Sequence, residues 1–344
     1  MNGLSGTLEK LLCGIDLAEA EAAELMVALT DEDLAPALAA ALLAALRAKG
    51  ETAAEVRGFA TAMRGLARKP EIRANGPLLD IVGTGGDGSG SLNLSTGASL
   101  LAAACGLPVV KHGNRSISSR SGSADMLEAL GMRLPPDEHA ATACLEATGY
   151  TFLFAPYFHP AMKAIGPVRR AMGVRTVFNM LGPLTNPAAP PYLLLGAFSP
   201  AAARLMAEAL AGFAGLERGF VVHGAPGWDE ATPVGPFQLF DVRGGEVVEH
   251  QRDPAEWGLA RCTPEDLAGG DAVHNAARLR ALFAGEDTDP HRDAVLLGTA
   301  LALELTGLAG HPAAAMEMAR AALLDGRAAA LLAALESHAA ETPA

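Results

Sequence analysis

The stretch from Leu79 to Gly131 restricts the fold of this chain more than any other part of the sequence. It reads as a short apolar strand, a glycine-rich loop, an apolar helix, a second strand, a basic serine-rich loop and another helix. Strands that alternate with helices in this way usually form a parallel sheet with helices packed against it. Ligands of such sheets bind beyond the carboxyl ends of the strands, where both of these loops would lie.

The same alternation extends from about residue 74 to residue 223. Apolar β-rich runs occur at 78–82, 107–110, 151–155, 193–198 and 219–223, and helical segments at 95–105, 121–131, 137–148 and 200–214. This pattern predicts an α/β fold with a mostly parallel central sheet flanked by helices. Residues 225–260 read as a loop and a hairpin that turns at Gly244-Gly245, and residues 272–338 read as helices with a cap near Asp293.

The first 70 residues read as helices only. Thr30 is predicted to cap a helix that has an acidic first turn and ends at Gly50. Thr52 and Glu55 match the capping-box pattern at the start of the next helix. We therefore predict a small helical domain over residues 1–72, with a return contribution from about 165–185, and a larger α/β domain over residues 73–344.

The crossing segment, residues 156–187, interrupts the alternation with five prolines. One helix is predicted from Pro167, and a second over Thr176 to Leu181. In this segment the chain would return to the helical domain and cross back to the sheet.

Charge and cysteine usage exclude several classes of function. The formal net charge is −13, whereas binding to nucleic acids or anionic membranes rests on many cationic contacts, so neither is expected as a partner. The longest apolar run, residues 34–46, contains Pro36 and is too short to span a membrane. The four scattered cysteines form no CxxC pair, and their mostly apolar or helical surroundings predict buried free thiols in a reducing compartment, the cytoplasm.

The glycine loop, residues 83–90, contains five glycines and precedes a helix that opens with Asn93, Ser95 and Thr96. Glycine lets backbone N–H groups approach a ligand, and a helix N-terminus favours phosphate. A tight structural turn is an equal interpretation of the glycines alone. Asp87 would repel phosphate, so we expect it to orient the loop or to reach a metal-bound water or a ribose hydroxyl.

The serine-rich loop, residues 114–122, follows the second strand and is basic. Lys111, Arg115 and Arg120 alternate with five serines over residues 111–123, a combination that suits several phosphate oxygens at once. The alternative is a solvated basic loop. Its position after a strand, in an acidic chain, favours phosphate binding.

Two further candidates lie later in the chain. The acidic pair, Asp229 and Glu230, follows an apolar strand and a turn, and it could bind Mg²⁺ together with phosphate oxygens, or it could be a surface turn. Arg169 and Arg170 lie on the predicted helix of the crossing segment, where one of them could clamp a substrate carboxylate, or both could be solvated. No zinc site is indicated.

Together these motifs resemble the anthranilate phosphoribosyltransferase family over nearly the whole chain. The most specific matches are DIVGTGGD at 80–87, NLST at 93–96, KHGNRSISS at 111–119, SGSADMLEALG at 121–131, FLFAPYFHPAMK at 152–163, PVR at 167–169 and RTVFNMLGPLTNP at 175–187. The resemblance implies a glycosyltransferase of tryptophan biosynthesis. Such an enzyme transfers phosphoribose from phosphoribosyl pyrophosphate (PRPP) to the amine of anthranilate, with Mg²⁺ and release of pyrophosphate. A homodimer joined through the small helical domains is implied as well.

The resemblance also implies roles for individual residues. Those implied to bind the donor PRPP are Gly83, Gly86, Asp87, Ser91, Asn93, Leu94, Ser95, Thr96, Lys111, His112, Gly113, Asn114, Arg115, Ser116, Ile117, Ser118, Ser119 and Ser123. Gly83, Asn114 and Arg169 would contact anthranilate, with Arg169 facing its carboxylate. Ser95, Asp229 and Glu230 would bind Mg²⁺, and Lys111 would act with the acidic pair in stabilising the leaving group. The sequence offers no convincing general base.

Departures from the family pattern leave the acceptor open. Ser91-Leu92 stands where the family commonly has Thr-Phe, the sequence after Glu230 differs, and His274 stands where Glu is common. A phosphoribosyltransferase of the same fold with another aromatic acceptor is therefore the alternative. A non-catalytic relative that binds nucleic acid is disfavoured by the retained glycine loop and the acidity of the chain. The basic motif fits a pyrimidine nucleoside phosphorylase poorly.

Overall fold

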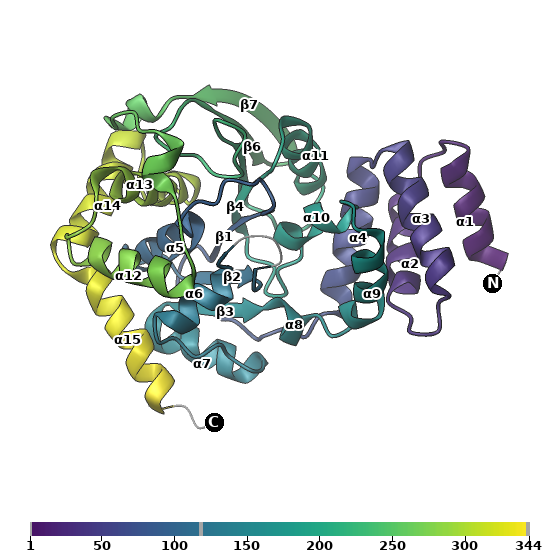
Figure 1. Cartoon of the computed structure of the whole chain (residues 1–344), viewed down its shortest axis with the longest axis horizontal. Coiled ribbons are helices and arrows are strands. Elements are labelled where there is room, and N and C mark those ends of the chain that lie inside the picture. Colours follow the sequence, from purple (N-terminus) through teal and green to yellow (C-terminus); the bar gives the residue numbers. More distant parts are fainter. Residues whose placement is uncertain (1, 117–119, 342–344) are drawn as a thin grey trace.

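The computed structural model describes residues 2–116 and 120–341, which form a central sheet with helices on both of its faces (Figure 1). The strands are β1 (Leu79–Gly83), β2 (Val109–Gly113), β3 (Tyr150–Phe154), β4 (Tyr192–Gly196), β5 (Arg218–His223), β6 (Phe237–Arg243) and β7 (Glu246–Arg252). Their order in the sheet is β3-β2-β1-β4-β5-β6-β7. The first five run parallel and β6 and β7 antiparallel, so the predicted mostly parallel sheet is confirmed.

The helices connect these strands and flank the sheet at both ends of the chain. They are α1 (Asn2–Leu12), α2 (Glu19–Leu29), α3 (Pro36–Lys49), α4 (Ala53–Leu66), α5 (Leu94–Ala104), α6 (Ser123–Ala129), α7 (Glu138–Thr148), α8 (Ala155–Phe158), α9 (Met162–Met172), α10 (Phe178–Leu181), α11 (Pro200–Leu210), α12 (Ala272–Phe283), α13 (Asp289–Leu305), α14 (Pro312–Leu324) and α15 (Arg327–Glu341). In Figure 1, α1–α4 lie at one end of the molecule and α12–α15 at the other.

The two faces of the sheet belong to different hydrophobic cores, because successive side chains of a strand point to opposite faces. Ile81 and Leu194 pack in a core with α5 and α12–α15. Val82 and Leu195 pack in a second core that continues through α11 into the N-terminal helices. The crossing segment contributes Phe178 to this second core. Since one core joins the N-terminal helices to the sheet, the division at residue 72 stays a prediction.

The capping signals of the N-terminal helices are partly confirmed. Thr52 Oγ1 accepts a hydrogen bond from the Glu55 N–H at 3.3 Å, and Glu55 Oε2 accepts one from the Thr52 N–H at 2.8 Å. Gly50 ends α3 in the left-handed region, at φ 91°. The predicted cap at Thr30 is wrong, because Thr30 ends α2. The next helix, α3, begins at Pro36, since proline at the first helical position lacks only an N–H that has no partner there.

Two other predicted helix starts are wrong. The helix expected from Pro167 begins earlier, at Met162, and contains this proline in its interior. Asp293 does not cap a helix but lies inside α13, whose N-cap is Thr288.

The four cysteines are free. Cys105 and Cys144 are buried as expected and Cys262 is partly buried, whereas Cys13 is exposed. Within the described residues, no helix is long and apolar enough to cross a membrane.

Candidate active site

The centre of the sheet contains a switch point between β1 and β4. These strands are neighbours, but the chain leads from β1 to β2 on one side and from β4 to β5 on the other. A crevice forms at the carboxyl ends of two such strands. Gly83 and Gly196 are paired at those ends, and a Cβ atom on either would lie within 2.4 Å of Asp229. The two glycines therefore allow the acidic pair to lie directly across the switch point.

Hydrogen bonds tie Asp229 to the glycine loop. Its Oδ2 accepts from the Gly85 N–H at 2.5 Å and from Thr84 Oγ1 at 3.3 Å, and its own N–H donates to Asp87 Oδ2 at 3.2 Å. The other oxygen of Asp87 accepts from the Ser89 N–H at 3.0 Å. This geometry supports the interpretation that Asp87 orients the loop.

Glu230 joins the same site to the N-terminus of α5. Its Oε1 accepts from the Ser95 N–H at 2.8 Å, and its buried Oε2 has no hydrogen-bond partner among the described residues. Burial raises the pKa of Glu230, and the nearby charge of Asp229 raises it further. Burial and then Asp87 raise the pKa of Asp229. A buried carboxylate beside a partly buried one with an unpartnered oxygen suits a divalent cation.

A metal site made of protein ligands alone is not present in the described part of the chain. No group of three or more His, Cys, Asp or Glu side chains is placed there to hold an ion. Mg²⁺ commonly binds through one or two carboxylates, with substrate phosphates and water completing its octahedron. The acidic pair fits that mode, with Ser95 adjacent to Glu230.

Lys111 lies on β2, fully buried, and its Nζ donates to the carbonyl of Ile81. Burial lowers the pKa of Lys111, while Asp80, Glu230 and Asp229, in this order, oppose that effect. The ammonium group is thus close enough to the acidic pair to interact with it electrostatically. Its hydrogen bond, however, is to the main chain of β1.

Sequence reasoning missed a buried polar cluster that includes Asp80 of β1 and His112 of β2. Asp80 accepts from the His112 N–H at 3.2 Å and from Asn186 Nδ2 at 2.8 Å, and Asn186 also donates to the carbonyl of Val110 at 2.9 Å. His112 Nδ1 lies 3.2 Å from the Gly182 carbonyl. Burial raises the pKa of Asp80 to about 6. A carboxylate inside an apolar strand was the available signal for this cluster.

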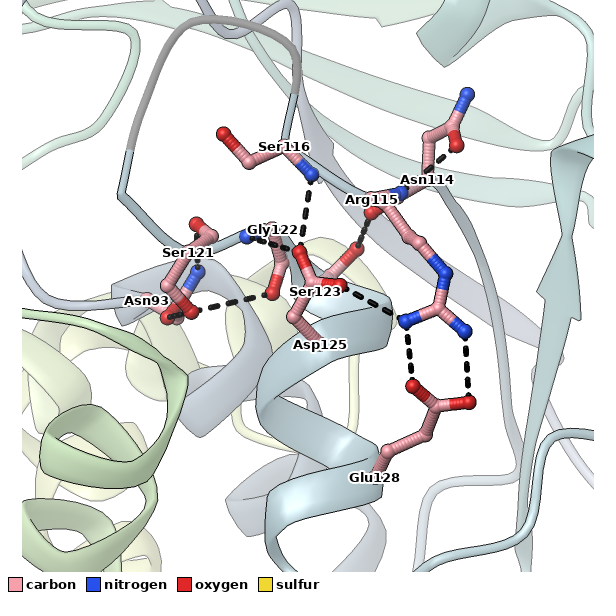
Figure 2. A network of polar contacts seen from close by, with 9 residues as sticks. All are labelled: Asn93, Asn114, Arg115, Ser116, Ser121, Gly122, Ser123, Asp125 and Glu128. Carbon is pink, nitrogen blue, oxygen red and sulfur yellow. Dashed lines mark hydrogen bonds and ion pairs between the residues drawn. The ribbon is translucent and has the colours of Figure 1, made fainter.

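The serine-rich loop is attached to α6, as Figure 2 shows. Arg115 donates to Asp125 Oδ1 at 2.9 Å and to Glu128 Oε1 at 2.8 Å. Asn114 Oδ1 accepts from the Arg115 N–H at 2.7 Å, and Asn114 is exposed. The guanidinium of Arg115, a residue expected to bind the donor PRPP, therefore points to α6. The expected donor residues Ile117, Ser118 and Ser119 lie outside the described residues.

Asn93 connects the N-terminus of α5 to two other segments. Its Nδ2 donates to the Ser121 carbonyl at 3.1 Å, and its Oδ1 accepts from Ser121 Oγ at 3.0 Å and from Asn275 Nδ2 at 2.8 Å. Asn275 Oδ1 in turn accepts from the Gly270 N–H at 2.8 Å. Asn275 was missed because its partner lies far away in the sequence. These bonds hold the serine-rich loop, α5 and α12 together.

The remaining expected donor residues lie on the same edge of the sheet. Gly83 and Gly113 end β1 and β2, and Gly86 and Ser91 belong to the turn before α5. Leu94 and Thr96 are buried in the first turn of α5. Ser116 lies in the serine-rich loop, and Ser123 is the first residue of α6. Ser123 Oγ donates to the Asn114 carbonyl at 3.2 Å.

Arg169 is a half-buried cation on α9. Its guanidinium lies 4.6 Å above the ring of Phe178 and makes no hydrogen bond or ion pair with any residue that the structure describes. Burial lowers its pKa. Its neighbour Arg170 is exposed. A half-buried guanidinium without a carboxylate partner suits the binding of an anionic ligand.

Arg175, the third arginine of the crossing segment, was missed by sequence reasoning. It donates to the carbonyl of Gly86 in the glycine loop, and its guanidinium stacks 4.2 Å above Phe198. Its own carbonyl accepts from Arg47 Nη1 at 2.6 Å. The motif RTVFN is distinctive in the sequence, but nothing local to it indicates a contact with the glycine loop.

Comparisons with known proteins agree with this architecture. Residues 75–329 match the family model described as glycosyl transferase family, a/b domain, and residues 6–67 match the one described as glycosyl transferase family, helical bundle domain. The chain is 47% identical over 314 residues to the anthranilate phosphoribosyltransferase of Chloroflexus aggregans. That alignment covers 91% of this chain and 92% of the relative.

Solved structures are similar over nearly the whole chain. The anthranilate phosphoribosyltransferase of Thermus thermophilus superposes with a TM-score of 0.90 at 44% identity, covering 97% of this chain and 99% of that one. The Saccharomyces cerevisiae enzyme in complex with PRPP and Mg gives 0.89 at 26% identity, covering 98% of both chains. The yeast enzyme with 4-fluoroanthranilate gives 0.87 at 25% identity, again covering 98% of both.

Proposed function

This chain belongs to the anthranilate phosphoribosyltransferase family of glycosyl transferases, and we infer that it transfers phosphoribose from PRPP to the amine of anthranilate in tryptophan biosynthesis. The observation that carries the assignment of the site is the acidic pair, held across the carboxyl ends of β1 and β4 between the glycine loop and α5. We propose that PRPP binds at this edge of the sheet, through the donor residues that the sequence predicts.

Backbone groups would do much of the donor binding. The glycine loop and the first turn of α5 offer N–H groups at a helix N-terminus, where phosphate is favoured. Ser95, Asp229 and Glu230 would hold Mg²⁺, which when bound supplies positive charge that stabilises the pyrophosphate leaving group. The unpartnered Glu230 Oε2 supports this assignment, as does the yeast relative solved with PRPP and Mg.

The chemistry requires charge stabilisation more than proton transfer. Cleavage of the bond between ribose and pyrophosphate leaves negative charge on the leaving group, and the buried ammonium of Lys111 offers a fixed positive charge beside the acidic pair. Arg169 would bind the carboxylate of anthranilate and so position its amine. Gly83 and Asn114 would line the boundary between the two substrates. An aromatic amine is already a nucleophile, so we propose no general base.

We further propose a cytoplasmic homodimer joined through the N-terminal helices. Leu12, Ile15 and Val27 are large apolar side chains exposed on this part of the molecule, which supports an interface there. The free cysteines fit a reducing compartment. We also propose the division into a helical domain, residues 1–72 with 165–185, and an α/β domain, residues 73–344.

Turnover of anthranilate tests the proposed function. Purified protein with PRPP and Mg²⁺ is expected to consume anthranilate, measured as loss of its fluorescence. The double variant Asp229→Asn, Glu230→Gln should lose about 100-fold or more in kcat. Its Tm should not fall, because it removes charges whose burial is unfavourable. Glu246→Gln, an exposed change on β7, is the control. Pyrophosphate binding without anthranilate turnover by the unmodified protein would point to a different acceptor.

A further inference from the structure

We propose that Asp125 of α6 is a positioning residue for donor binding, because one carboxylate fixes both ends of the serine-rich loop. Its Oδ2 accepts from the Ser116 N–H at 3.1 Å and from the Gly122 N–H at 3.0 Å (Figure 2). The proposal rests on the proposed function, in which Asn114, Ser116 and Ser123, described residues in and beside this loop, bind PRPP. Asp125 itself need not contact the substrate.

The two ends of the loop approach each other closely at this carboxylate. A Cβ atom on Gly122 would lie 2.3 Å from the Ser116 nitrogen and 2.5 Å from the carbonyl carbon of Arg115. The described ends of the loop therefore meet at a glycine, and Asp125 bonds both sides of the meeting point. Asp125 thereby fixes the backbone at Ser116 and Gly122, so less conformational entropy is lost when Ser116, a proposed donor residue, contacts a ligand.

Charge strengthens the bonds to Asp125. Partial burial acts to raise its pKa, but the hydrogen bonds from Ser116 and Arg115 outweigh it and lower the pKa. The carboxylate is therefore ionised at neutral pH and accepts three charge-assisted bonds, two from the backbone and one from Arg115. An amide side chain at this position would accept fewer of these bonds.

Glu128 has a different part in the same cluster. It binds the guanidinium of Arg115, whereas the backbone N–H groups at the two described ends of the loop donate to Asp125. It is more exposed than Asp125, at 41% against 25% of the side chain, and it binds the guanidinium through both of its carboxylate oxygens. The ion pair between Glu128 and Arg115 can thus be removed experimentally without removing the hydrogen bonds from the loop backbone to Asp125.

Three substitutions at Asp125 and Glu128 test the proposal. Asp125→Ala removes the acceptor of two backbone N–H groups and should raise the KM for PRPP at least about tenfold, with the KM for anthranilate changed less than about threefold. Asp125→Asn keeps the side-chain shape and one oxygen, so its effect should be intermediate. Glu128→Gln leaves the loop ends bonded and should change the KM for PRPP less than about threefold.

The control is Asp137→Ala, which removes a carboxylate from the start of α7, where it accepts from the Ala140 N–H at 2.8 Å. It should lower the Tm as Asp125→Ala does, without changing the KM for PRPP. Calorimetric binding of pyrophosphate with Mg²⁺ gives a second readout, which remains valid even if anthranilate is not the acceptor. Equal KM and pyrophosphate affinity in Asp125→Asn and the unmodified protein would overturn the proposal, as would equal effects of Asp125→Ala and Asp137→Ala.

Discussion

His112 and His159 are buried against each other, and no carboxylate among the described residues raises the pKa of either ring. Their ring centroids lie 5.1 Å apart in an edge arrangement, and the Nε2 atom of each has no hydrogen-bond partner among the described residues. Burial lowers the pKa of His112 to about 3 and that of His159 to about 4. Both rings are therefore neutral in the folded protein at neutral pH, whereas an unfolded histidine titrates near about 6.5.

This difference predicts a loss of stability in acid. Below pH about 6.5 the unfolded chain takes up a proton at His159 that the folded protein does not, so the free energy of unfolding falls as the pH falls toward about 4. His159→Asn should remove about 2 kcal/mol of the stability lost between pH 7.5 and pH 5. Urea unfolding at both pH values measures this change in the free energy of unfolding. The control is His250→Asn, a substitution of an exposed histidine.

The neighbouring Asp80 acts in the opposite direction. Its pKa is raised, so its contribution to stability is lost as the pH rises from about 4 through about 6. Because Asp80 is present in all the compared proteins, its effect largely cancels in the difference between them. An identical pH dependence in the His159→Asn variant and the unmodified protein would contradict the burial of a neutral His159.

The residues that could be predicted are those whose chemistry is visible in a short segment. The acidic pair, the glycine loop and the serine-rich loop can each be recognised by composition, and each follows a strand as expected. Asp80, Asn186 and Arg175 could not be given roles, since each acts through a partner far away in the sequence. Asn186 lies 106 residues from Asp80, and no local pattern connects them.

Close packing of α2 against α4 depends on Gly58. A Cβ atom there would lie 2.2 Å from the Glu19 carbonyl oxygen and 3.0 Å from the Ala22 Cβ atom. No real Cβ atom approaches a backbone oxygen that closely, so the two helices would have to move apart. The small side chains of these helices predict close packing in general, but only the structure places Gly58 against the Glu19 carbonyl.

Two glycines of α4 should therefore respond oppositely to the same substitution. Gly58→Ala should lower the free energy of unfolding by about 2 kcal/mol or more through overpacking. Gly65→Ala lies on the same helix with nothing within 4 Å of its new methyl group, so it should stabilise by about 0.5–1 kcal/mol. Thermal unfolding of both variants measures the contrast. A neutral Gly58→Ala would mean that α2 and α4 are farther apart in solution.

The errors in helix boundaries have a common physical cause. Thr30 has a side chain that can cap the start of a helix, but here its Oγ1 donates to the Val27 carbonyl at 2.7 Å and ends α2. A hydroxyl can satisfy either end of a helix, so the local sequence did not decide between them. Pro167 can begin a helix or be tolerated within one, and apolar packing of Ile165 extends α9 ahead of it. Tertiary contacts decided both cases.

The N-terminal helices and the glycine loop are joined through one chain of contacts. Arg47 of α3 donates to the carbonyl of Arg175, and Arg175 donates to the carbonyl of Gly86. The hydrophobic core that α1–α4 share with the sheet also joins these parts of the molecule. A helical domain recognised only by its sequence pattern gives no sign of such a link, because it depends on how the crossing segment returns over the sheet.

This chain of contacts predicts that a change outside the glycine loop weakens donor binding. Arg175→Ala removes the charged hydrogen bond to Gly86 and the stacking on Phe198, and it should raise the KM for PRPP about tenfold. Arg47→Ala removes the exposed hydrogen bond to the Arg175 carbonyl and should raise the KM for PRPP less than about threefold. Arg170→Ala, an exposed arginine of α9, removes the same charge and serves as the control. Steady-state kinetics with varied PRPP measure all three, and similar KM values for the Arg175 and Arg170 variants would show that net charge, not the contact with Gly86, sets donor affinity.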